Sequence, residues 1–418
     1  MKKIQLILLC VLPVLVNGQL VESCQKELTK LPPVNIRQIL AHSSAVLPDS
    51  QNQVQRLDSA IFEGANGRSQ KRLFEYDASG NAILRTDFDR DRQSGQWREN
   101  ARYEMHYTLQ NKLSSVILYQ WNSQLNIWLK YQKNESAYHS SGNRVLTVDY
   151  VWDERTSNWQ EYTKIQVMLD INDSPVAETY YKWDSSTKRW EEETQKVTHY
   201  DWLGNMTLES NSSWDRQTNR RVNSKKQAVT YGPQNYITID NYGWDKQLNS
   251  WIKEKSAKYV HDIKNNRTPV EIFDGHTQTG EWSNRERYDF TFDADGNIVI
   301  AEGFQWEARS NSWERCRQYN YLYDAGKNQT AIECYVPDSR ADEWKGYFKT
   351  TYAFDESDRK IQEVHYSWDA QTKTWINGMK NDYTYTLSGN LKTNSIFDWM
   401  NNGWVVSSSE TFYYQEMQ

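Results

Sequence analysis

Tryptophan is the residue type whose number and spacing point to ligand binding in this sequence. The chain has 418 residues, and 19 of them are Trp. An exposed indole ring is a flat apolar platform on which a sugar ring can stack, and an exposed row of such rings would mark a binding site. Trp202 follows an Asp within a turn motif and lies outside the pattern formed by the other tryptophans. We therefore predict Trp202 as a ligand-stacking residue, with Trp121, Trp152 and Trp183 as further candidates.

The other 18 tryptophans form two columns of an internal repeat. Each column recurs about every 31 residues, and the two columns lie seven residues apart within one repeat. Arg221 stands where the second column requires Trp, and the first column has three exceptions, which are Arg90, Gly275 and Pro337. This periodicity predicts about eleven copies of one supersecondary unit, each burying its apolar side against its neighbours. The simplest role for the columns is a structural ladder of cross-strand aromatic pairs.

Two turn motifs alternate along the repeat and define its elements. One is aromatic-Asp-x-x-Gly-Asn, as in residues 76–81, where Asp can cap its own backbone and Gly and Asn tolerate positive φ. The other is Trp-Asp-x-x-Thr-x-x-Trp, as in residues 152–159, which predicts a longer hairpin loop. The intervening segments, roughly nine to eleven residues long, are rich in Tyr, Thr, Val and Ile and predict strands.

The expected fold is all-β, with about eleven two-stranded repeats of 31 residues in one long antiparallel meander, twisted or coiled on itself. Side chains alternate along a strand, so Tyr150 and Trp152 share one face, and Trp159, Val167 and Leu169 share one as well. We expect all aromatic columns on a single face and mainly Lys, Gln, Glu, Thr and Ser on the other. A propeller of four-stranded blades would use two repeats per blade, and eleven copies do not divide evenly. The sequence leaves open whether the sheet coils, closes or stays open.

The aromatic-Asp turns between residues 76 and 390 resemble the YD repeats of RHS-type proteins, which build spiralling antiparallel β-sheet shells. The resemblance implies a similar sheet geometry. The Trp-Asp hairpin departs from that pattern and is similar to Trp-rich tandem repeats of uncharacterised exported bacterial proteins. RHS shells enclose a toxic C-terminal domain, and that role is not expected here, because the sequence ends four residues after Tyr414.

The N-terminal residues have the pattern of an export signal. Lys2 and Lys3 precede an apolar run over residues 4–16, and small or permissive residues lead up to Gln19. The run is shorter than the roughly 20 residues of a transmembrane helix, so no transmembrane segment is predicted. We expect residues 1–18 to be a signal peptide, residues 19–55 an N-terminal lead or cap, and residues 56–418 the repeat array. The protein would then be exported to the periplasm, the outer surface or the medium.

Export to an oxidising compartment also bears on the cysteines. Cys316 and Cys334 flank the turn at residues 324–327 almost symmetrically, so we predict that they face each other and form a disulfide. Cys24 is left over, either free or in an intermolecular bond.

Composition and motifs argue against several functions. A formal net charge of −6 gives no electrostatic reason to expect nucleic acid as a partner. The seven histidines form no zinc motif, and the calcium-loop-like residues 293–297 lack the closing Glu. No nucleophile elbow, phosphate loop or dinucleotide motif is present. The sequence therefore predicts no catalytic, cofactor-binding or metal-binding residue and no enzyme activity.

The function expected from the sequence is a non-catalytic exported or surface-associated repeat protein that presents an extended β surface to a polysaccharide or a surface protein. A purely structural component of the cell envelope is the alternative. A secreted carbohydrate-active enzyme is a third hypothesis, which would require acids gathered in a concave pocket. The oligomeric state does not follow from the sequence.

Overall fold

The computed structural model describes residues 55–232, 236–260, 267–275, 282–338 and 343–416. The predicted signal peptide, most of the N-terminal lead and Cys24 lie outside the described residues. Among the described residues, no helix is long and apolar enough to cross a membrane.

The described chain is built from 24 strands. In chain order they are β1 (Gln55–Gly64), β2 (Ser69–Tyr76), β3 (Ala82–Arg90), β4 (Trp97–Tyr107), β5 (Leu113–Asn122), β6 (Ile127–Tyr138), β7 (Arg144–Asp153), β8 (Asn158–Leu169), β9 (Pro175–Asp184), β10 (Arg189–Tyr200), β11 (Met206–Asp215), β12 (Arg220–Tyr231), β13 (Tyr236–Asp245), β14 (Ser250–Val260), β15 (Arg267–Gly275), β16 (Trp282–Phe292), β17 (Ile298–Glu307), β18 (Ser312–Tyr323), β19 (Gln329–Pro337), β20 (Trp344–Phe354), β21 (Lys360–Asp369), β22 (Thr374–Tyr385), β23 (Leu391–Met400) and β24 (Gly403–Glu416).

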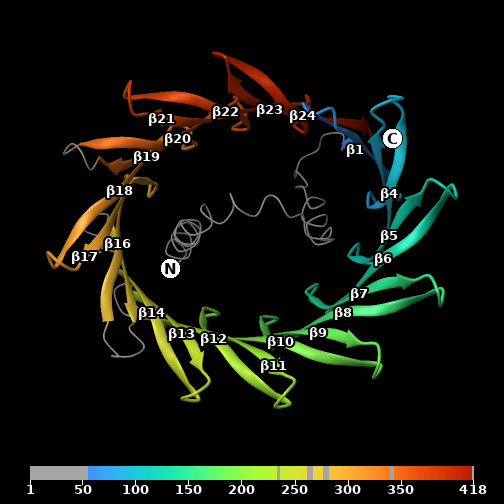
Figure 1. Ribbon diagram of the computed structural model, residues 1–418, viewed down its shortest axis with the longest axis horizontal. Helices are drawn as coiled ribbons and strands as arrows, with labels where there is room; N and C mark the ends of the chain where they lie inside the picture. Colours follow the sequence, from blue (N-terminus) through green and yellow to red (C-terminus); the bar gives the residue numbers. More distant parts are fainter. Residues whose placement is uncertain (1–54, 233–235, 261–266, 276–281, 339–342, 417–418) are drawn as a thin grey trace. The chain divides into compact units, whose positions relative to one another are not determined.

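The strands form one antiparallel meander that closes on itself. Each strand pairs with the next one in the chain, and β1 also pairs with β24, from Gln55 opposite Glu416 to Gly64 opposite Ser408. The result is a ring of strands in which the first and last strands are neighbours (Figure 1). The all-β meander is confirmed, and the sheet closes.

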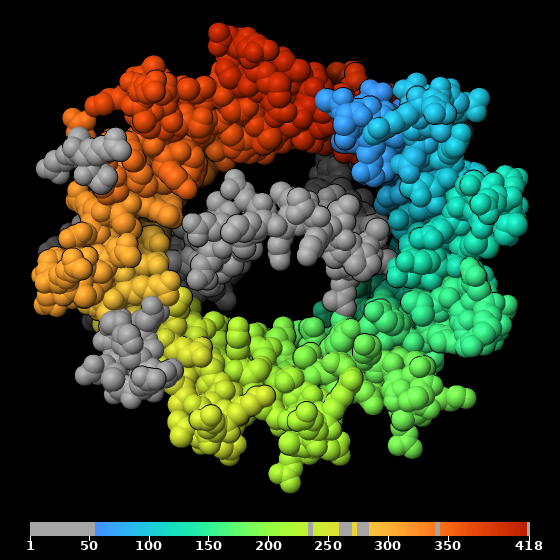
Figure 2. Space-filling view, in the orientation of Figure 1, coloured from blue at the N-terminus to red at the C-terminus, as the bar shows by residue number. Residues whose placement is uncertain are grey.

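Eleven hairpins, from β3–β4 to β23–β24, carry the Trp motif positions, and β1–β2 is a twelfth hairpin without them. Two kinds of connection alternate. We call the aromatic-Asp connections between hairpins, such as residues 201–205 between β10 and β11, the short turns. The other connections are the loops that join the two strands of each hairpin. In the space-filling view, the hairpins between β9 and β13 project as separate fingers (Figure 2).

The short turns have the predicted backbone chemistry. Their fourth position is left-handed, with φ of 88° at Gly80, 82° at Gly204 and 90° at Gly389, where a residue without Cβ is unstrained. Asn111 and Asp173 occupy the same position with φ of 56° and 61°, and these residue types tolerate that region best after Gly.

Every repeat contains a β-bulge that the sequence motifs did not indicate. The bulged residue follows the second Trp column by three positions and is skipped in the pairing with the preceding strand. These residues are Asn100, Tyr131, Tyr162, Glu193, Ser224, Glu254, Arg285, Cys316, Tyr347, Gly378 and Ser407. Bulges bend a strand and increase its twist. Their repetition gives the physical reason why a long meander curls enough to close.

The Trp columns share one face of the sheet, as predicted, and we call it the indole face. Trp121 pairs with Trp128 and Trp152 with Trp159 directly across their hairpins. Seven such pairs are T-shaped, with ring centroids 4.9 to 5.2 Å apart.

Two expectations about the faces are wrong. Val167 and Leu169 lie on the face opposite Trp159, because the bulge at Tyr162 shifts the alternation of β8 by one residue. The opposite face is also not mainly polar. It contains Phe290 and Leu118, both buried, so the sheet buries apolar side chains on both faces.

Candidate functional site

Three of the predicted stacking residues, Trp121, Trp152 and Trp183, are half-buried members of the ladder on the indole face. Each ring meets its cross-strand partner edge to face, at centroid distances of 5.0, 5.0 and 5.1 Å. The ammonium group of Lys130 also lies 4.4 Å from the ring centre of Trp152. Their surroundings are those of structural rings.

Lysines from the middle of one repeat extend the ladder to the next repeat. The Lys133 ammonium lies 4.1 Å from the ring centre of Tyr150 and 5.6 Å from that of Trp159. Lys164 repeats the arrangement at 4.1 Å from Tyr181 and 4.9 Å from Trp190. Cation–π contacts of this kind stabilise by about 0.5–2 kcal/mol each. The ladder therefore links neighbouring hairpins as well as the two strands of each hairpin.

The ladder is interrupted in the hairpin β11–β12, where Arg221 replaces Trp. Its guanidinium forms an ion pair of 2.7 Å with Glu192 and a hydrogen bond with Gln195, both in β10. Arg216 adds an ion pair of 3.1 Å to Glu191. Ion pairs therefore connect this repeat to the preceding one, whereas cation–π contacts connect the repeats joined by Lys133 and Lys164.

Trp202 differs from the ladder residues because it is 90% exposed. It lies in the short turn between β10 and β11, whose backbone is held by Asp201. The Asp201 carboxylate accepts hydrogen bonds from the backbone N–H groups of Leu203 and Asn205, both at 2.9 Å. The amide side chain of Asn205 donates a further bond to this carboxylate and, as the largest cause, lowers the Asp201 pKa. The indole thus projects from a rigid turn.

Three pairs of neighbouring short turns are connected through an Asn at the last position of the motif. The Asn81 amide donates to the Asn111 side chain at 3.1 Å, the Asn143 amide to the Asp173 carbonyl at 3.1 Å, and the Asn328 amide to the Asp358 carboxylate at 2.8 Å. In the turn at residues 170–174 this position is Ser174, whose side chain is too short to make the same bridge to the turn that carries Trp202.

A hollow of about 720 Å³ lies where the Asn bridge is replaced. Its lining residues are Asp170, Asn172, Ser174, Val176, Val197, Thr198, His199, Tyr200, Asp201, Trp202, Leu203 and Gly204. Ile171, at the tip of the preceding turn, is fully exposed. An exposed indole therefore stands beside a shallow depression that contains hydroxyl, amide, imidazole and carboxylate groups.

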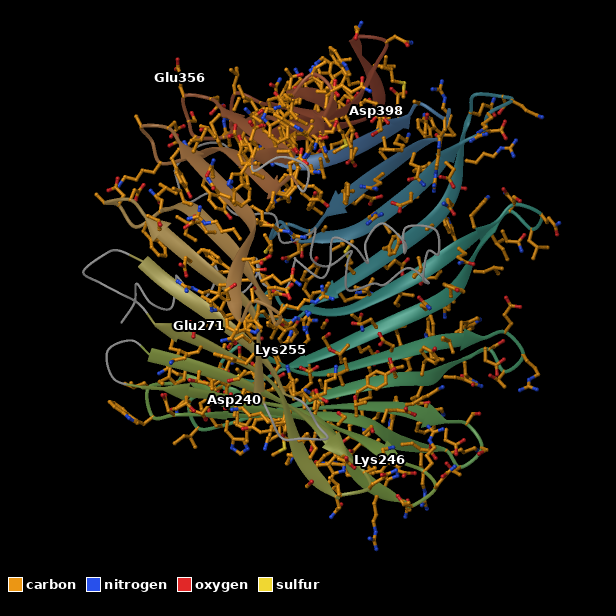
Figure 3. The ribbon with its side chains drawn as sticks, turned by 60° about the vertical axis from the view of Figure 1, so that its left-hand side comes forward. Asp240, Lys246, Lys255, Glu271, Glu356 and Asp398 are labelled. Atoms are coloured by element: carbon orange, nitrogen blue, oxygen red, sulfur yellow. The ribbon has the colours of Figure 1, made fainter. Side chains whose placement is uncertain are left out.

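A related hollow of about 620 Å³ lies at the corresponding place near β20–β23. There the bridging position is Arg359, which pairs with Asp355 at 2.7 Å and lies 4.7 Å from the ring centre of Tyr385. The exposed tips are Leu387 and Glu356, and the latter is visible at the end of its turn in Figure 3. This hollow has no exposed aromatic ring at the tip, so the Trp202 hollow is the candidate site.

The predicted exposure of Trp202 agrees with the structure, whereas the hollow beside it was missed. The sequence indicated it only weakly: Ser174 replaces Asn at the last position of the turn motif, but so do Lys112 and Arg359. Metal ligands do not gather in the described ranges, where no group of three or more His, Cys, Asp or Glu side chains could hold an ion. The calcium-loop-like Asp295 instead forms an ion pair of 2.8 Å with Lys327.

The prediction that Cys316 faces Cys334 is wrong. Cys334 lies opposite Tyr319, three positions away from Cys316, and both cysteines are free thiols. The turn between β18 and β19 is centred on Gly326, because the Asp324 N–H donates to the Asn328 carbonyl, and this moves the pairing by two positions. The bulge at Thr330 adds one more position, and Cys316 is itself a bulged residue.

No protein-family model matches this chain, and no curated protein matches it. Among solved structures, it is similar to a protein of unknown function from Bacteroides fragilis, with 15% identity, a TM-score of 0.28, and coverage of 31% of this chain and 91% of that one. A DUF3836 family protein from Bacteroides vulgatus has 21% identity and a TM-score of 0.19, with coverage of 22% and 89%. The TcdB2-TccC3 structure has 9% identity and a TM-score of 0.19, with coverage of 92% of this chain and 26% of that one. These likenesses identify no function for this chain.

Proposed function

We propose that this protein is a non-catalytic, exported or surface-associated binding protein, in which the closed sheet is a scaffold and the hollow beside Trp202 binds a sugar residue of a glycan. The observation that carries the proposal is an indole ring, 90% exposed, on a turn adjoining a hollow. A large aromatic side chain at such a position contributes nothing to the core.

The chemistry of the hollow supports a sugar. An indole offers an apolar face to the C–H groups of a pyranose ring, while the hydroxyl, amide and imidazole groups of Ser174, Asn172 and His199 can exchange hydrogen bonds with its hydroxyls. The turn that carries the indole is already ordered by Asp201, so binding costs little conformational entropy there.

We also propose that the hairpins are Trp-rich relatives of the YD repeats of RHS-type proteins. The aromatic-Asp turns with a left-handed fourth position support this assignment. It concerns the scaffold, and the binding proposal does not depend on it.

The test is a glycan-array screen followed by titration of the best ligand into the wild-type protein and the Trp202→Ala variant. Loss of binding in the variant is the expected result. Leu387→Ala is the matched control, because Leu387 is fully exposed and occupies the same position of an equivalent turn. The proposal fails if no glycan binds, or if Trp202→Ala binds as tightly as the wild type.

A further inference from the structure

The bulged residues direct their side chains to the face opposite the Trp ladder. The Asn100 amide donates to the Asp89 carboxylate at 2.7 Å, and a Cβ on Gly303 would lie 3.6 Å from the Cys316 sulfur. Asp89 and Gly303 both lie on the opposite face by strand register. A large side chain at a bulge therefore stands on the opposite face, outside the ladder.

Two consecutive bulges carry tyrosines. Tyr131 in β6 is 43% exposed and Tyr162 in β8 is 50% exposed. Tyr180, on β9, lies on the same face, and its pKa is raised first by burial and then by the nearby Tyr162. The pair thus presents two exposed aromatic rings, with a third aromatic side chain close behind.

The spacing of the two rings follows from the fold. Tyr131 and Tyr162 occupy the same position in neighbouring hairpins, so they are two strand spacings apart, which is about 10 Å. That distance is comparable with the length of a disaccharide unit in an extended β-1,4-linked polysaccharide. A chain laid across the strands would bring alternate sugar rings onto the two tyrosines.

The polar groups around the tyrosines are an engaged carboxylate, an exposed amide and one exposed ammonium group, that of Lys182. The Asp149 carboxylate between them accepts hydrogen bonds from Asn134 at 2.7 Å and Thr163 at 2.6 Å. Exposed Gln120, on the same face of β5, supplies an amide that can bind sugar hydroxyls. The Asp149 carboxylate is therefore already engaged. Stacking on two rings and hydrogen bonds to the amide outnumber the single cation, so we take the ligand to be uncharged.

We propose that Tyr131 and Tyr162 form a second binding surface, separate from the Trp202 hollow, for an extended and uncharged β-1,4-linked polysaccharide. The two rings act as consecutive stacking platforms. A disaccharide reaches one platform, whereas a tetrasaccharide reaches both.

The experiment uses the Trp202→Ala protein as background, so that failure of the first site cannot be confused with failure of this one. Cellotetraose, xylotetraose and N-acetylchitotetraose are titrated by calorimetry, together with the corresponding disaccharides. At least one tetrasaccharide should bind roughly tenfold more tightly than its disaccharide, and Tyr131→Ala and Tyr162→Ala should each weaken it by roughly tenfold.

Tyr347→Ala is the matched control. Tyr347 is a bulged residue with 56% exposure, but the neighbouring bulges carry Cys316 and Gly378 and so offer no second ring. Its removal should leave binding within about twofold. Tyr131→Phe should keep the affinity, because the stacking surface is retained.

Three results would overturn the proposal. The first is the absence of binding for all three tetrasaccharides. The second is that Tyr131→Ala and Tyr162→Ala leave the affinity unchanged, or that Tyr347→Ala lowers it as much as they do. The third is a preference for an acidic oligosaccharide such as tetragalacturonate, which the exposed Lys182 beside Tyr162 would explain.

Discussion

The hydroxyl of Tyr138 donates a hydrogen bond of 2.8 Å to the backbone carbonyl of Leu113, 25 residues earlier in the chain. Tyr138 precedes one short turn, and Leu113 begins the first strand after the preceding short turn. The bond therefore connects the segments beside two neighbouring short turns. The same contact recurs from Tyr107 to Ala82, Tyr200 to Pro175, Tyr231 to Met206, Tyr323 to Ile298, Tyr385 to Lys360 and Tyr414 to Leu391.

Tyr138→Phe removes this bond and leaves the aromatic ring in place. Because a part-buried carbonyl loses its partner, the free energy of unfolding should fall by about 1 kcal/mol in urea denaturation. Tyr131→Phe, at an exposed position, is the control and should change it little. Equal stability of the two variants would show that the bond is not stabilising.

Ser174→Asn should close the Trp202 hollow. The longer amide side chain can bridge to the next turn, as Asn143 does with Asp173. We expect weaker binding of the glycan identified for the wild type, with an unchanged or higher melting temperature. Ser174→Ala removes the hydroxyl but keeps the hollow open, so it should weaken binding less than Ser174→Asn does. Full affinity in Ser174→Asn would contradict the assignment of the hollow.

Trp152→Ala should be strongly destabilising. The substitution removes one ring of a T-shaped pair with Trp159 and the contact with Lys130. For a half-buried Trp we expect a loss of about 2–3 kcal/mol in the free energy of unfolding, below the range of fully buried positions. Trp202→Ala, on the surface, should change it by less than about 0.5 kcal/mol. Similar losses in both variants would contradict a structural role specific to the ladder.

The aspartates of the turns predict a loss of stability in acid. Hydrogen bonds from the side chains of Ser186 and Thr187, the largest causes, lower the pKa of Asp184 from 3.8 to about 2. The folded state therefore binds this proton less readily than the unfolded state, so the stabilisation is complete above about pH 4 and disappears as the pH falls towards 2. The pKa is lowered in the same direction at Asp77, Asp201, Asp293 and Asp355.

Melting temperatures measured between about pH 5 and pH 2 test the predicted loss of stability in acid. The wild type should lose stability continuously over that range. Asp184→Asn should be less stable than the wild type at pH 5, and the difference should vanish near pH 2. A difference that grows with acidity would contradict the hydrogen-bonded carboxylate.

The two thiols should differ in reactivity. Cys334 is 0% exposed, and burial raises its pKa to about 11, whereas Cys316 is only half-buried. Alkylation with iodoacetamide followed by mass spectrometry should modify Cys316 first and Cys334 only on unfolding. A disulfide between them would contradict the register of β18 and β19. It would be detected as a cross-linked pair of peptides that disappears on reduction.

The hairpins and turns could be predicted from the sequence because their determinants are local. An Asp that caps the turn and a Gly at its left-handed position lie within six residues, as in residues 76–81. The two Trp columns likewise mark positions that face each other directly across one hairpin, so a single face for the indoles followed from simple alternation.

The bulges could not be predicted in this way, because no residue type specifies them. The bulged position holds Asn100 in one repeat, Glu193 in another and Gly378 in a third. Each bulge changes the face of every residue that follows it in the strand. The error on Val167 comes from this shift. The error on the cysteine pair comes mainly from the centre of the turn, where Asp324 pairs with Asn328.

The candidate site was only half predictable. An unpaired Trp at a turn is a visible anomaly, whereas the hollow depends on how adjacent turns meet. Closure of the sheet was not predictable either, because it depends on the sum of many small twists and on pairing between β1 and β24.

That pairing also determines what a truncated chain would become. As long as β24 has not been made, both β1 and the last completed strand expose unpaired backbone groups, onto which a second molecule could add its own strands. A chain cut before residue 403 should therefore polymerise edge to edge. β24 acts as a safeguard against aggregation, and it can do so only after all the preceding strands have been made.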